Sequence, residues 1–192
     1  MIIVYGGTFN PPTKAHEKIA NLLIRKYNPQ KFMFLPVGDN YTQKDKSTSF
    51  YHRKNMLELV FKEPIFTVSS IENSETYKGT YWALNHIKDT YKSDVYFVLG
   101  ADNILNLDKW IESKRLVSEY KFIVLTRKGY DALGLIKEKH SKYLNNFYII
   151  DFNVDISSTE FRKNPKLTNY LNQEVLKYIK NNNLYEVNDD QA

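Results

Sequence analysis

The chain opens with Ile2-Ile3-Val4-Tyr5-Gly6-Gly7-Thr8-Phe9-Asn10-Pro11-Pro12-Thr13-Lys14-Ala15-His16. Its apolar first part predicts a buried strand, and apolar side chains recur at helical spacing over residues 15–23, which predicts a helix. Gly6 and Gly7 end the strand, where they allow a sharp turn and a close approach between backbone and ligand. The helix N-terminus that follows offers unpaired N–H groups to an anion. This opening therefore predicts a strand-turn-helix unit that binds an anionic group.

The same alternation of short apolar runs and helical stretches continues along the chain. Further strands are expected at Phe32–Leu35, Phe66–Val68, Val95–Leu99, Phe122–Leu125 and Tyr148–Ile150. Further helices are expected around Met56, around Leu84 and from Leu171 to Ile179. Because only a parallel sheet covered on both faces buries both sides of its strands, the pattern predicts a doubly wound α/β domain that binds ligands beyond the carboxyl ends of its strands. We expect one domain over residues 1–187 and a frayed tail over residues 188–192.

Composition restricts the class of protein. The 192 residues are 42% hydrophobic and 26% charged, fractions near globular averages that exclude disorder, collagen and coiled coil. Cysteine is absent, which excludes disulfides, cysteine-ligated zinc and thiol nucleophiles. No apolar run reaches the ~18 residues of a membrane span, and the first residues lack the pattern of a signal peptide. We therefore expect a cytoplasmic protein.

The charge balance points to an anionic partner. Lys and Arg total 27 against 22 Asp and Glu, a net charge of +5. That excess suits nucleic acid, an anionic membrane or a phosphorylated small molecule, and an aromatic fraction of 15% suits nucleic acid as well. Most Tyr and Phe lie in apolar runs, however, and no Arg-rich stripe with interleaved aromatics occurs. We therefore expect a small-molecule partner, without nucleic acid or membrane.

The turn after the first strand carries a candidate phosphate donor. Thr13 can cap the following helix, which places His16 in its first turn with the side chain leaning toward the N-terminus. The imidazole would then donate to a phosphate oxygen rather than act as a base. The glycine spacing matches neither the dinucleotide fingerprint G-x-G-x-x-G nor a P-loop. On these residues alone, a Thr13 that caps the helix and a His16 that only packs are more frequent than a His16 that binds phosphate.

A second polar stretch follows the last expected strand and reads Ile156-Ser157-Ser158-Thr159-Glu160-Phe161-Arg162. Hydroxyls and amides at a short helix N-terminus, with Arg162 one turn on, make a cradle for phosphate. The alternative is a capping box in which Ser157 and Glu160 satisfy each other's backbone, and the stretch alone favours neither. In a doubly wound sheet both polar stretches lie at one rim.

Together the two stretches resemble the signatures of the nucleotidyltransferase superfamily with the (H/T)-x-G-H motif. G-G-T-F-N-P-P-T-x-x-H resembles its first motif, with Ala15 where the motif usually has Gly, and I-S-S-T-x-x-R resembles its triphosphate-binding motif. From about Ile3 to Arg162 the chain is similar to the nicotinate and nicotinamide mononucleotide adenylyltransferase family, and most of all to its bacterial nicotinate type. The resemblance implies a Rossmann-like nucleotidyltransferase fold.

The resemblance also implies two substrate subsites. For ATP it implies Gly6, Gly7, Thr8, Phe9, Thr13, His16, Gly100, Asp102, Arg127, Ser157, Ser158, Thr159 and Arg162. For the mononucleotide it implies Thr8, Phe9, Lys44, Arg53, Thr80 and Trp110, with Lys46 as a lesser candidate. The expected catalytic residues are His16, Lys44 and Arg162. Carboxylate oxygens of Asp102 suit ribose hydroxyls and the Trp110 indole suits a pyridine ring, whereas Arg53 is as readily a packing partner.

The chemistry implied is adenylyl transfer. The 5′-phosphate of nicotinate mononucleotide, with nicotinamide mononucleotide as a second acceptor, attacks the α-phosphorus of ATP and gives deamido-NAD and pyrophosphate, a step of NAD biosynthesis. Positioning and charge stabilisation suffice, because a phosphate is already a nucleophile near neutral pH. Mg²⁺ is expected on substrate phosphates and water, without a protein ligand cage. Two alternatives stay open: another phosphorylated acceptor, such as phosphopantetheine or glycerol phosphate, and a non-catalytic nucleotide- or RNA-binding module. A homo-oligomer is compatible with the sequence.

Overall fold

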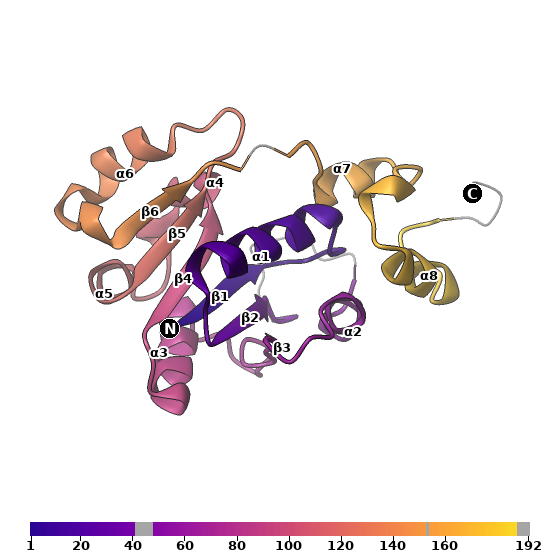
Figure 1. Ribbon diagram of the computed structural model, residues 1–192, viewed down its shortest axis with the longest axis horizontal. Coiled ribbons are helices and arrows are strands. Elements are labelled where there is room, and N and C mark those ends of the chain that lie inside the picture. Colours follow the sequence, from indigo (N-terminus) through magenta and orange to yellow (C-terminus); the bar gives the residue numbers. More distant parts are fainter. Residues whose placement is uncertain (41–47, 153, 188–192) are drawn as a thin grey trace.

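The computed structural model describes residues 1–40, 48–152 and 154–187, and forms an open sheet with helices on both faces (Figure 1). The sheet has six strands in the order β3-β2-β1-β4-β5-β6, all parallel. The strands are β1 (Ile2–Gly7), β2 (Lys31–Pro36), β3 (Phe66–Val68), β4 (Val95–Gly100), β5 (Lys121–Leu125) and β6 (Phe147–Ile150). Chain order reverses between β1 and β4, and ligands bind at such a switch point. The predicted doubly wound sheet is confirmed.

Helices fill the connections between the strands, and two further helices, α7 and α8, follow the last strand. The helices are α1 (Lys14–Tyr27), α2 (Phe50–Val60), α3 (Thr80–Tyr91), α4 (Ala101–Ile104), α5 (Ser113–Glu119), α6 (Ala132–His140), α7 (Ser158–Lys163) and α8 (Gln173–Asn181), with short 3-10 turns η1 (Leu107–Lys109), η2 (Ser141–Asn146) and η3 (Thr168–Tyr170). The apolar pattern of the sequence did not predict α4, α5 or α6. All three are short, and α6 begins at a side-chain cap, where Asp131 accepts a hydrogen bond from the backbone of Gly134.

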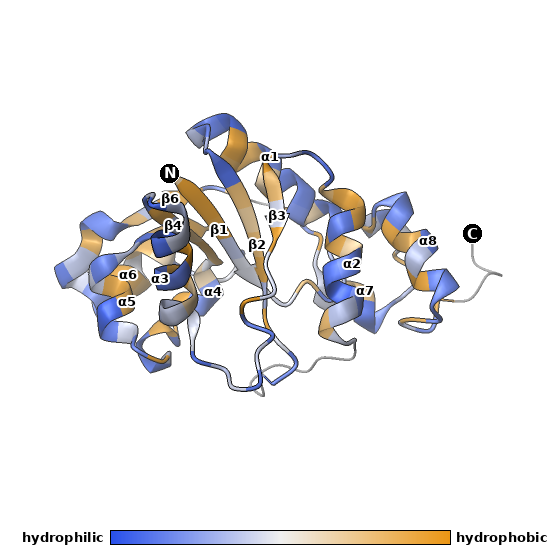
Figure 2. Cartoon of the chain, turned by 90° about the horizontal axis from the view of Figure 1, so that it is seen from below, coloured by the Kyte–Doolittle hydropathy of each residue, from blue (hydrophilic) through white to orange (hydrophobic). Residues whose placement is uncertain are grey.

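Two apolar layers sandwich the sheet, because successive strand residues point to opposite faces. Ile2 and Val4 of β1 pack with α3, α5 and α6 on one face. Ile3 and Tyr5 pack with α1 and α2 on the other. Figure 2 shows the apolar strands inside and the polar helix surfaces outside. The near-continuous apolar runs of the sequence follow from this burial on both sides.

The C-terminal helices form a third, smaller apolar cluster beside the sheet. It contains Met56 of α2, Phe161 of α7 and Leu171, Val175 and Ile179 around α8. Figure 1 shows α7 and α8 beyond α2, away from β5 and β6. Residues 188–192, the expected frayed tail, lie outside the described residues. In the part of the chain that the structure describes, each helix is too short or too polar to cross a bilayer.

Candidate active site

A cavity of about 1250 Å³ opens at the carboxyl ends of β1, β4 and β5. Single drug-sized ligands typically occupy ~300–1,000 Å³, so this cavity has room for two such groups side by side. The sequence-predicted residues on its wall are Gly6, Gly7, Thr8, Phe9, His16, Thr80, Gly100, Asp102, Trp110, Arg127, Ser157, Ser158, Thr159 and Arg162. Thr13 and Arg53 are placed behind the wall, and Lys44 and Lys46 lie outside the described residues. The two polar stretches of the sequence therefore meet at one site.

The turn after β1 approaches its neighbours closely. A Cβ on Gly6 would lie 2.4 Å from Cζ of Phe97 on β4, so only glycine fits there. Phe9 has a φ of 52° and a ring that is 2% exposed, packed edge-on against Tyr5 with centroids 5.3 Å apart. This left-handed residue turns the chain from the strand toward α1.

Side chains of α7 hold the far half of this turn. Ser158 Oγ donates to the carbonyl of Pro11 at 2.7 Å, and Arg162 Nη1 donates to the carbonyl of Asn10 at 2.6 Å. Charged donors make the stronger hydrogen bonds, so Arg162 ties the two polar stretches firmly. The remaining guanidinium donors of Arg162 and the amides at the start of α7 lie at the cavity wall.

Arg53 holds the near half of the turn from behind. It is fully buried, and its guanidinium donates to the carbonyls of Thr8 at 2.9 Å, Val37 at 2.8 Å and Thr48 at 3.1 Å. Nη2 also pairs with a carboxylate oxygen of Asp39 at 3.1 Å. Burial lowers the pKa of Arg53, and the bond to Asp39 opposes that shift. The structure thus places Arg53 between the turn after β1 and both ends of the connection from β2 to α2, which is the packing role, rather than on the substrate side of the wall.

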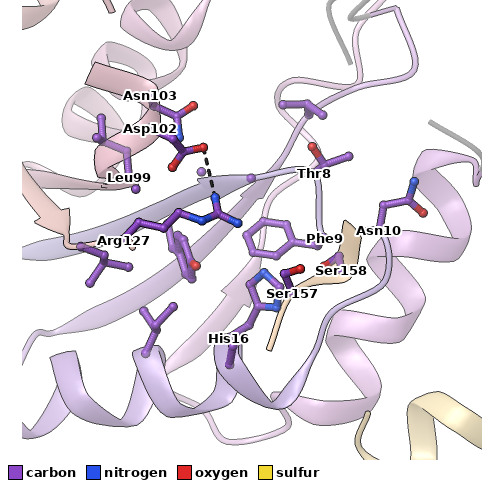
Figure 3. A pocket seen from close by; sticks show the side chains of 18 of the residues that line it. Thr8, Phe9, Asn10, His16, Leu99, Asp102, Asn103, Arg127, Ser157 and Ser158 are labelled. Carbon is purple, nitrogen blue, oxygen red and sulfur yellow. Dashed lines mark ion pairs between the residues drawn. The ribbon is translucent and has the colours of Figure 1, made fainter. Parts of the chain in front are cut away.

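Thr13 and His16 form a reciprocal cap at the start of α1. The backbone N–H of Thr13 donates to His16 Nδ1 at 2.9 Å, and the Thr13 hydroxyl lies 3.0 Å from the same nitrogen. Since a backbone N–H only donates, Nδ1 is the acceptor and the proton of the neutral ring is on Nε2. Burial lowers the pKa of His16 from 6.5 to about 4, with a smaller contribution from the nearby Arg127 charge. His16 is therefore a neutral donor at the cavity wall near pH 7 (Figure 3).

In the second polar stretch, Ser157 caps the start of α7, whereas Ser158 bonds to the turn after β1. Ser157 Oγ accepts from the backbone N–H of Glu160 at 3.1 Å and contacts the Glu160 carboxylate at 3.1 Å. Half of the expected capping box is thus present, because the Glu160 carboxylate meets the Ser157 hydroxyl and not its backbone N–H. Thr159 Oγ1 accepts a long contact from Arg162 Nη2 at 3.5 Å. All five residues still line the cavity, so capping orders a wall that can bind phosphate.

Asp102 and Arg127 form an ion pair across the cavity. Arg127 Nη1 lies 3.1 Å from Asp102 Oδ2, and both side chains are partly exposed (Figure 3). The second oxygen, Oδ1, is buried and has no hydrogen-bond donor among the described residues. It lies 2.4 Å from the position that a Cβ on Gly100 would take. A carboxylate oxygen with free capacity suits a ligand hydroxyl.

The other end of the cavity is aromatic and closed by the start of α3. Trp110 lines it and meets Phe97 edge-on, with centroids 6.2 Å apart. Thr80 is the first residue of α3, 6% exposed, and its hydroxyl donates to Glu72 at 3.5 Å. Gly79 before it has a φ of 88°, a conformation that favours glycine. A flat ring and its polar substituent fit between these groups.

Several residues of the cavity wall were not predicted as site residues from the sequence. They are Asn40, Glu72, Tyr77, Asn103, Asn106, Lys109, Ile111, Lys128, Phe152, Val154 and Asp155, together with Asn10 of the turn. Their common signal is position, because most follow the carboxyl end of a predicted strand, where ligands bind in such sheets. No special residue type marks them.

Comparison with known proteins agrees with this geometry. A profile of the cytidylyltransferase-like family matches residues 4–164. The chain belongs to that family. A relative from Acholeplasma laidlawii named "Probable nicotinate-nucleotide adenylyltransferase" is 40% identical over 192 residues, 97% of this chain and 98% of its own. Another of the same name from Clostridium acetobutylicum is 32% identical over 196 residues, 95% of this chain and 97% of its own. The predicted resemblance is confirmed, and these relatives place the chain among the nicotinate-nucleotide adenylyltransferases.

Solved structures of this family have the same fold. The nicotinic acid mononucleotide adenylyltransferase of Plasmodium falciparum complexed with NaAD superimposes with a TM-score of 0.80 at 26% identity, covering 97% of this chain and 98% of that one. Its complex with APC gives a TM-score of 0.79 over the same shares. The Rossmann-like nucleotidyltransferase fold is therefore confirmed for this chain.

Proposed function

We propose that this protein joins ATP and nicotinate mononucleotide to give deamido-NAD and pyrophosphate, a step of NAD biosynthesis. The observation that carries the proposal is the meeting of two polar stretches at one cavity, where Ser158 and Arg162 are hydrogen-bonded to the turn that ends at His16. A triphosphate and a second phosphate need such a convergence of donors. The names of the full-length relatives and the ligand NaAD in a related structure support the same substrates.

The reaction requires alignment and charge stabilisation. An oxygen of the mononucleotide 5′-phosphate bonds to the α-phosphorus of ATP, the bond from that phosphorus to the bridging oxygen breaks, and pyrophosphate leaves with the electron pair. His16 donates from Nε2, and Arg162 adds a fixed positive charge, while the phosphate nucleophile needs no base. Lys44 is proposed as a further cation on the transferred phosphate.

The subsites follow the polarity of the wall. The Asp102 and Arg127 side fits the ribose and adenine of ATP, because it offers a carboxylate oxygen with free capacity and a planar cation. The Trp110 and Thr80 side fits the pyridine ring of the mononucleotide. We assign nicotinate as the main substituent of that ring, as the relatives' names indicate, with nicotinamide as a second acceptor.

ATP is expected to enter as its Mg²⁺ complex. The wall offers His16, serine hydroxyls and guanidinium groups to anionic phosphates. Its carboxylates do not gather with other acidic or histidine side chains into a group of three that could hold a metal ion, among the residues that the structure describes. The Mg²⁺ ion would therefore be held by ATP phosphates and water and would offset the charge of the leaving pyrophosphate. The proposal also includes a cytoplasmic location, as expected for a step of NAD biosynthesis, while phosphopantetheine or RNA as partner is not favoured by the relatives.

A product assay tests the proposal. The purified protein is incubated with ATP, Mg²⁺ and, in parallel, nicotinate mononucleotide, nicotinamide mononucleotide or phosphopantetheine. We expect pyrophosphate and a dinucleotide with the first acceptor, a slower reaction with the second and none with the third. Folded protein that releases no pyrophosphate with either mononucleotide would overturn the proposal, and preference for phosphopantetheine would establish the alternative acceptor.

A further inference from the structure

The segment after α8 runs back to the binding turn. In it the Tyr185 hydroxyl contacts the side-chain oxygen Oδ1 of Asn10, a residue 175 positions earlier in the chain. Because an amide oxygen only accepts, the Tyr185 hydroxyl is the donor of this hydrogen bond. Asn10 is 1% exposed and lines the cavity, whereas Tyr185 is outside the set of described wall residues. Tyr185 therefore influences substrates indirectly, and Asn10 is the wall residue that its hydroxyl contacts.

The backbone around Tyr185 is strained. Asn183, Tyr185 and Glu186 have φ values of 51°, 60° and 54°. Non-glycine residues adopt this left-handed region rarely, and they stay there only where surrounding contacts hold them. The Tyr185 ring meets Phe161 edge-on with centroids 5.8 Å apart, and its hydroxyl reaches Asn10. The left-handed backbone conformation of residues 183, 185 and 186 thus accompanies the placement of the Tyr185 hydroxyl against the turn.

Asn10 is held from two directions. Its carbonyl accepts from Arg162 Nη1 at 2.6 Å, and its side chain accepts from Tyr185. The first contact fixes the peptide group, and the second fixes rotation of the side chain within a buried position. Phe9 precedes it in the turn and His16 follows on the same wall. Fixing Asn10 on both sides leaves the turn one conformation to present to both substrates.

We propose that Tyr185 is a positioning residue for the transferase reaction, acting through the Asn10 side chain to hold the substrate-binding turn in one conformation. This inference rests on the proposed function for its kinetic readout. A turn that samples several conformations binds substrate only from a fraction of them, so its apparent affinity falls by that fraction. Loss of the hydroxyl therefore weakens the productive complex without removing a substrate contact.

The test uses a pair of matched substitutions. Tyr185→Phe removes the hydroxyl and keeps the ring on Phe161. Tyr178→Phe is the control, because the Tyr178 hydroxyl bonds His52 Nδ1 at 2.9 Å and Asn55 Nδ2 at 3.0 Å in the same helical cluster, away from the turn. We expect Tyr185→Phe to lower kcat/KM for both substrates by about twofold to tenfold, the equivalent of one net hydrogen bond. Tyr178→Phe should lower the thermal midpoint and leave kcat/KM as in the wild type.

A double-mutant cycle with Asn10→Ala identifies the route of the effect. If Tyr185 acts through Asn10, Tyr185→Phe has no further effect on kcat/KM in the Asn10→Ala background. An unchanged kcat/KM for Tyr185→Phe, an equal loss in both backgrounds, or a loss that both tyrosine variants share would each overturn the proposal. Should the wild type form no dinucleotide, the proposed function fails by itself. Binding of a non-hydrolysable ATP analogue then tests Tyr185, with an equal Kd in wild type and Tyr185→Phe as the overturning result.

Discussion

His16 offers the cavity a nitrogen whose proton is fixed by a backbone contact. The Thr13 N–H donates to Nδ1, so the neutral ring has its proton on Nε2. Burial lowers the pKa of the ring to about 4, which keeps it neutral at physiological pH. The protonated Nε2 can donate to a phosphate oxygen, while the lone pair of Nδ1 is occupied by the Thr13 N–H. The hydrogen bond that caps the helix therefore also leaves Nε2 of His16 as the nitrogen that can donate.

Removing this donor should reduce turnover far more than stability. We expect His16→Ala to lower kcat by about 10²–10³, the range seen when one preorganised donor to transition-state charge is lost. Steady-state pyrophosphate release, combined with denaturant unfolding, measures both effects. His86→Ala is the control, because His86 is exposed on α3 and stacks only on Trp82. An unfolded His16→Ala protein would instead assign His16 to core packing.

The same pKa predicts how stability depends on pH. Unfolded His16 binds a proton below its ordinary pKa of 6.5, whereas folded His16 does so only near 4. Between these values the unfolded state binds more protons, so the stability contribution of His16 falls as pH drops through that window. Denaturant unfolding of wild type and His16→Gln at pH 7, 6 and 5 checks this. The wild type should lose stability relative to the variant on acidification, and a constant difference would refute the shifted pKa.

At the scale of elements, the site depends on loops that are joined by a single buried cation. Arg53 of α2 binds carbonyls of Thr8 in the turn after β1, of Val37 just after β2 and of Thr48 shortly before α2. Asp39 completes the link, since its carboxylate also accepts from the backbone N–H of Phe50 at the start of α2. A point cation such as lysine lacks the planar fork that reaches several acceptors at once.

Loss of this clamp should be costly. We expect Arg53→Met to reduce the free energy of unfolding by about 3 kcal/mol or more, because buried carbonyls that lose their donors cost ~1–3 kcal/mol each. Lys54→Met is the control on the next residue, whose half-exposed pair with Glu58 is worth about 1 kcal/mol at most. Urea unfolding measures both. A stable Arg53→Met protein that selectively loses mononucleotide affinity would favour the substrate-binding role instead.

The sequence predicts elements where one pattern dominates. All six strands occur within a residue or two of the predicted runs. The inner strands are buried on both faces, which leaves an unbroken apolar run, and the edge strands β3 and β6 have apolar runs although they are less buried. The N-cap residues Thr13 of α1 and Ser157 of α7 followed from cap chemistry. The helices α4, α5 and α6 were missed because their few apolar positions define no clear period.

Long-range hydrogen bonds to backbone explain what sequence reasoning could not assign in the site. The motif residues Ser158 and Arg162 were expected at phosphate, yet in the structure they also bind turn carbonyls. Arg53 was expected on the mononucleotide and is instead behind the wall. Its partners are main-chain oxygens, which every residue has, so the sequence does not show which residues Arg53 contacts. Position in the fold, rather than residue identity, selects such contacts.

At the scale of the whole molecule, the cavity joins parts that are stabilised separately. The turn and α1 belong to one sheet face, whereas Phe161 of α7 belongs to the C-terminal cluster with α8. Hydrogen bonds from Ser158 and Arg162 cross between them. A ligand that contacts both polar stretches therefore adds a further link between the sheet and the C-terminal helices.

Ligand binding should consequently stabilise the entire chain. A non-hydrolysable ATP analogue at 100 times its Kd is expected to raise the free energy of unfolding by about 2.7 kcal/mol, if it binds only the folded state. Urea unfolding with and without the analogue measures this gain. At the same analogue concentration Arg162→Gln should show a smaller gain, because its charge on the triphosphate is lost. Equal gains in both proteins would contradict a role for Arg162 in ATP binding.

The two hydrogen bonds between α7 and the turn join residues that are 147 and 152 positions apart in the sequence. On a ribosome that adds ~5–20 residues per second, the turn therefore waits roughly 8 to 30 s for its partners. During synthesis the first strand and turn therefore leave the ribosome before Ser158 and Arg162, the residues that hold the turn from α7, have been made.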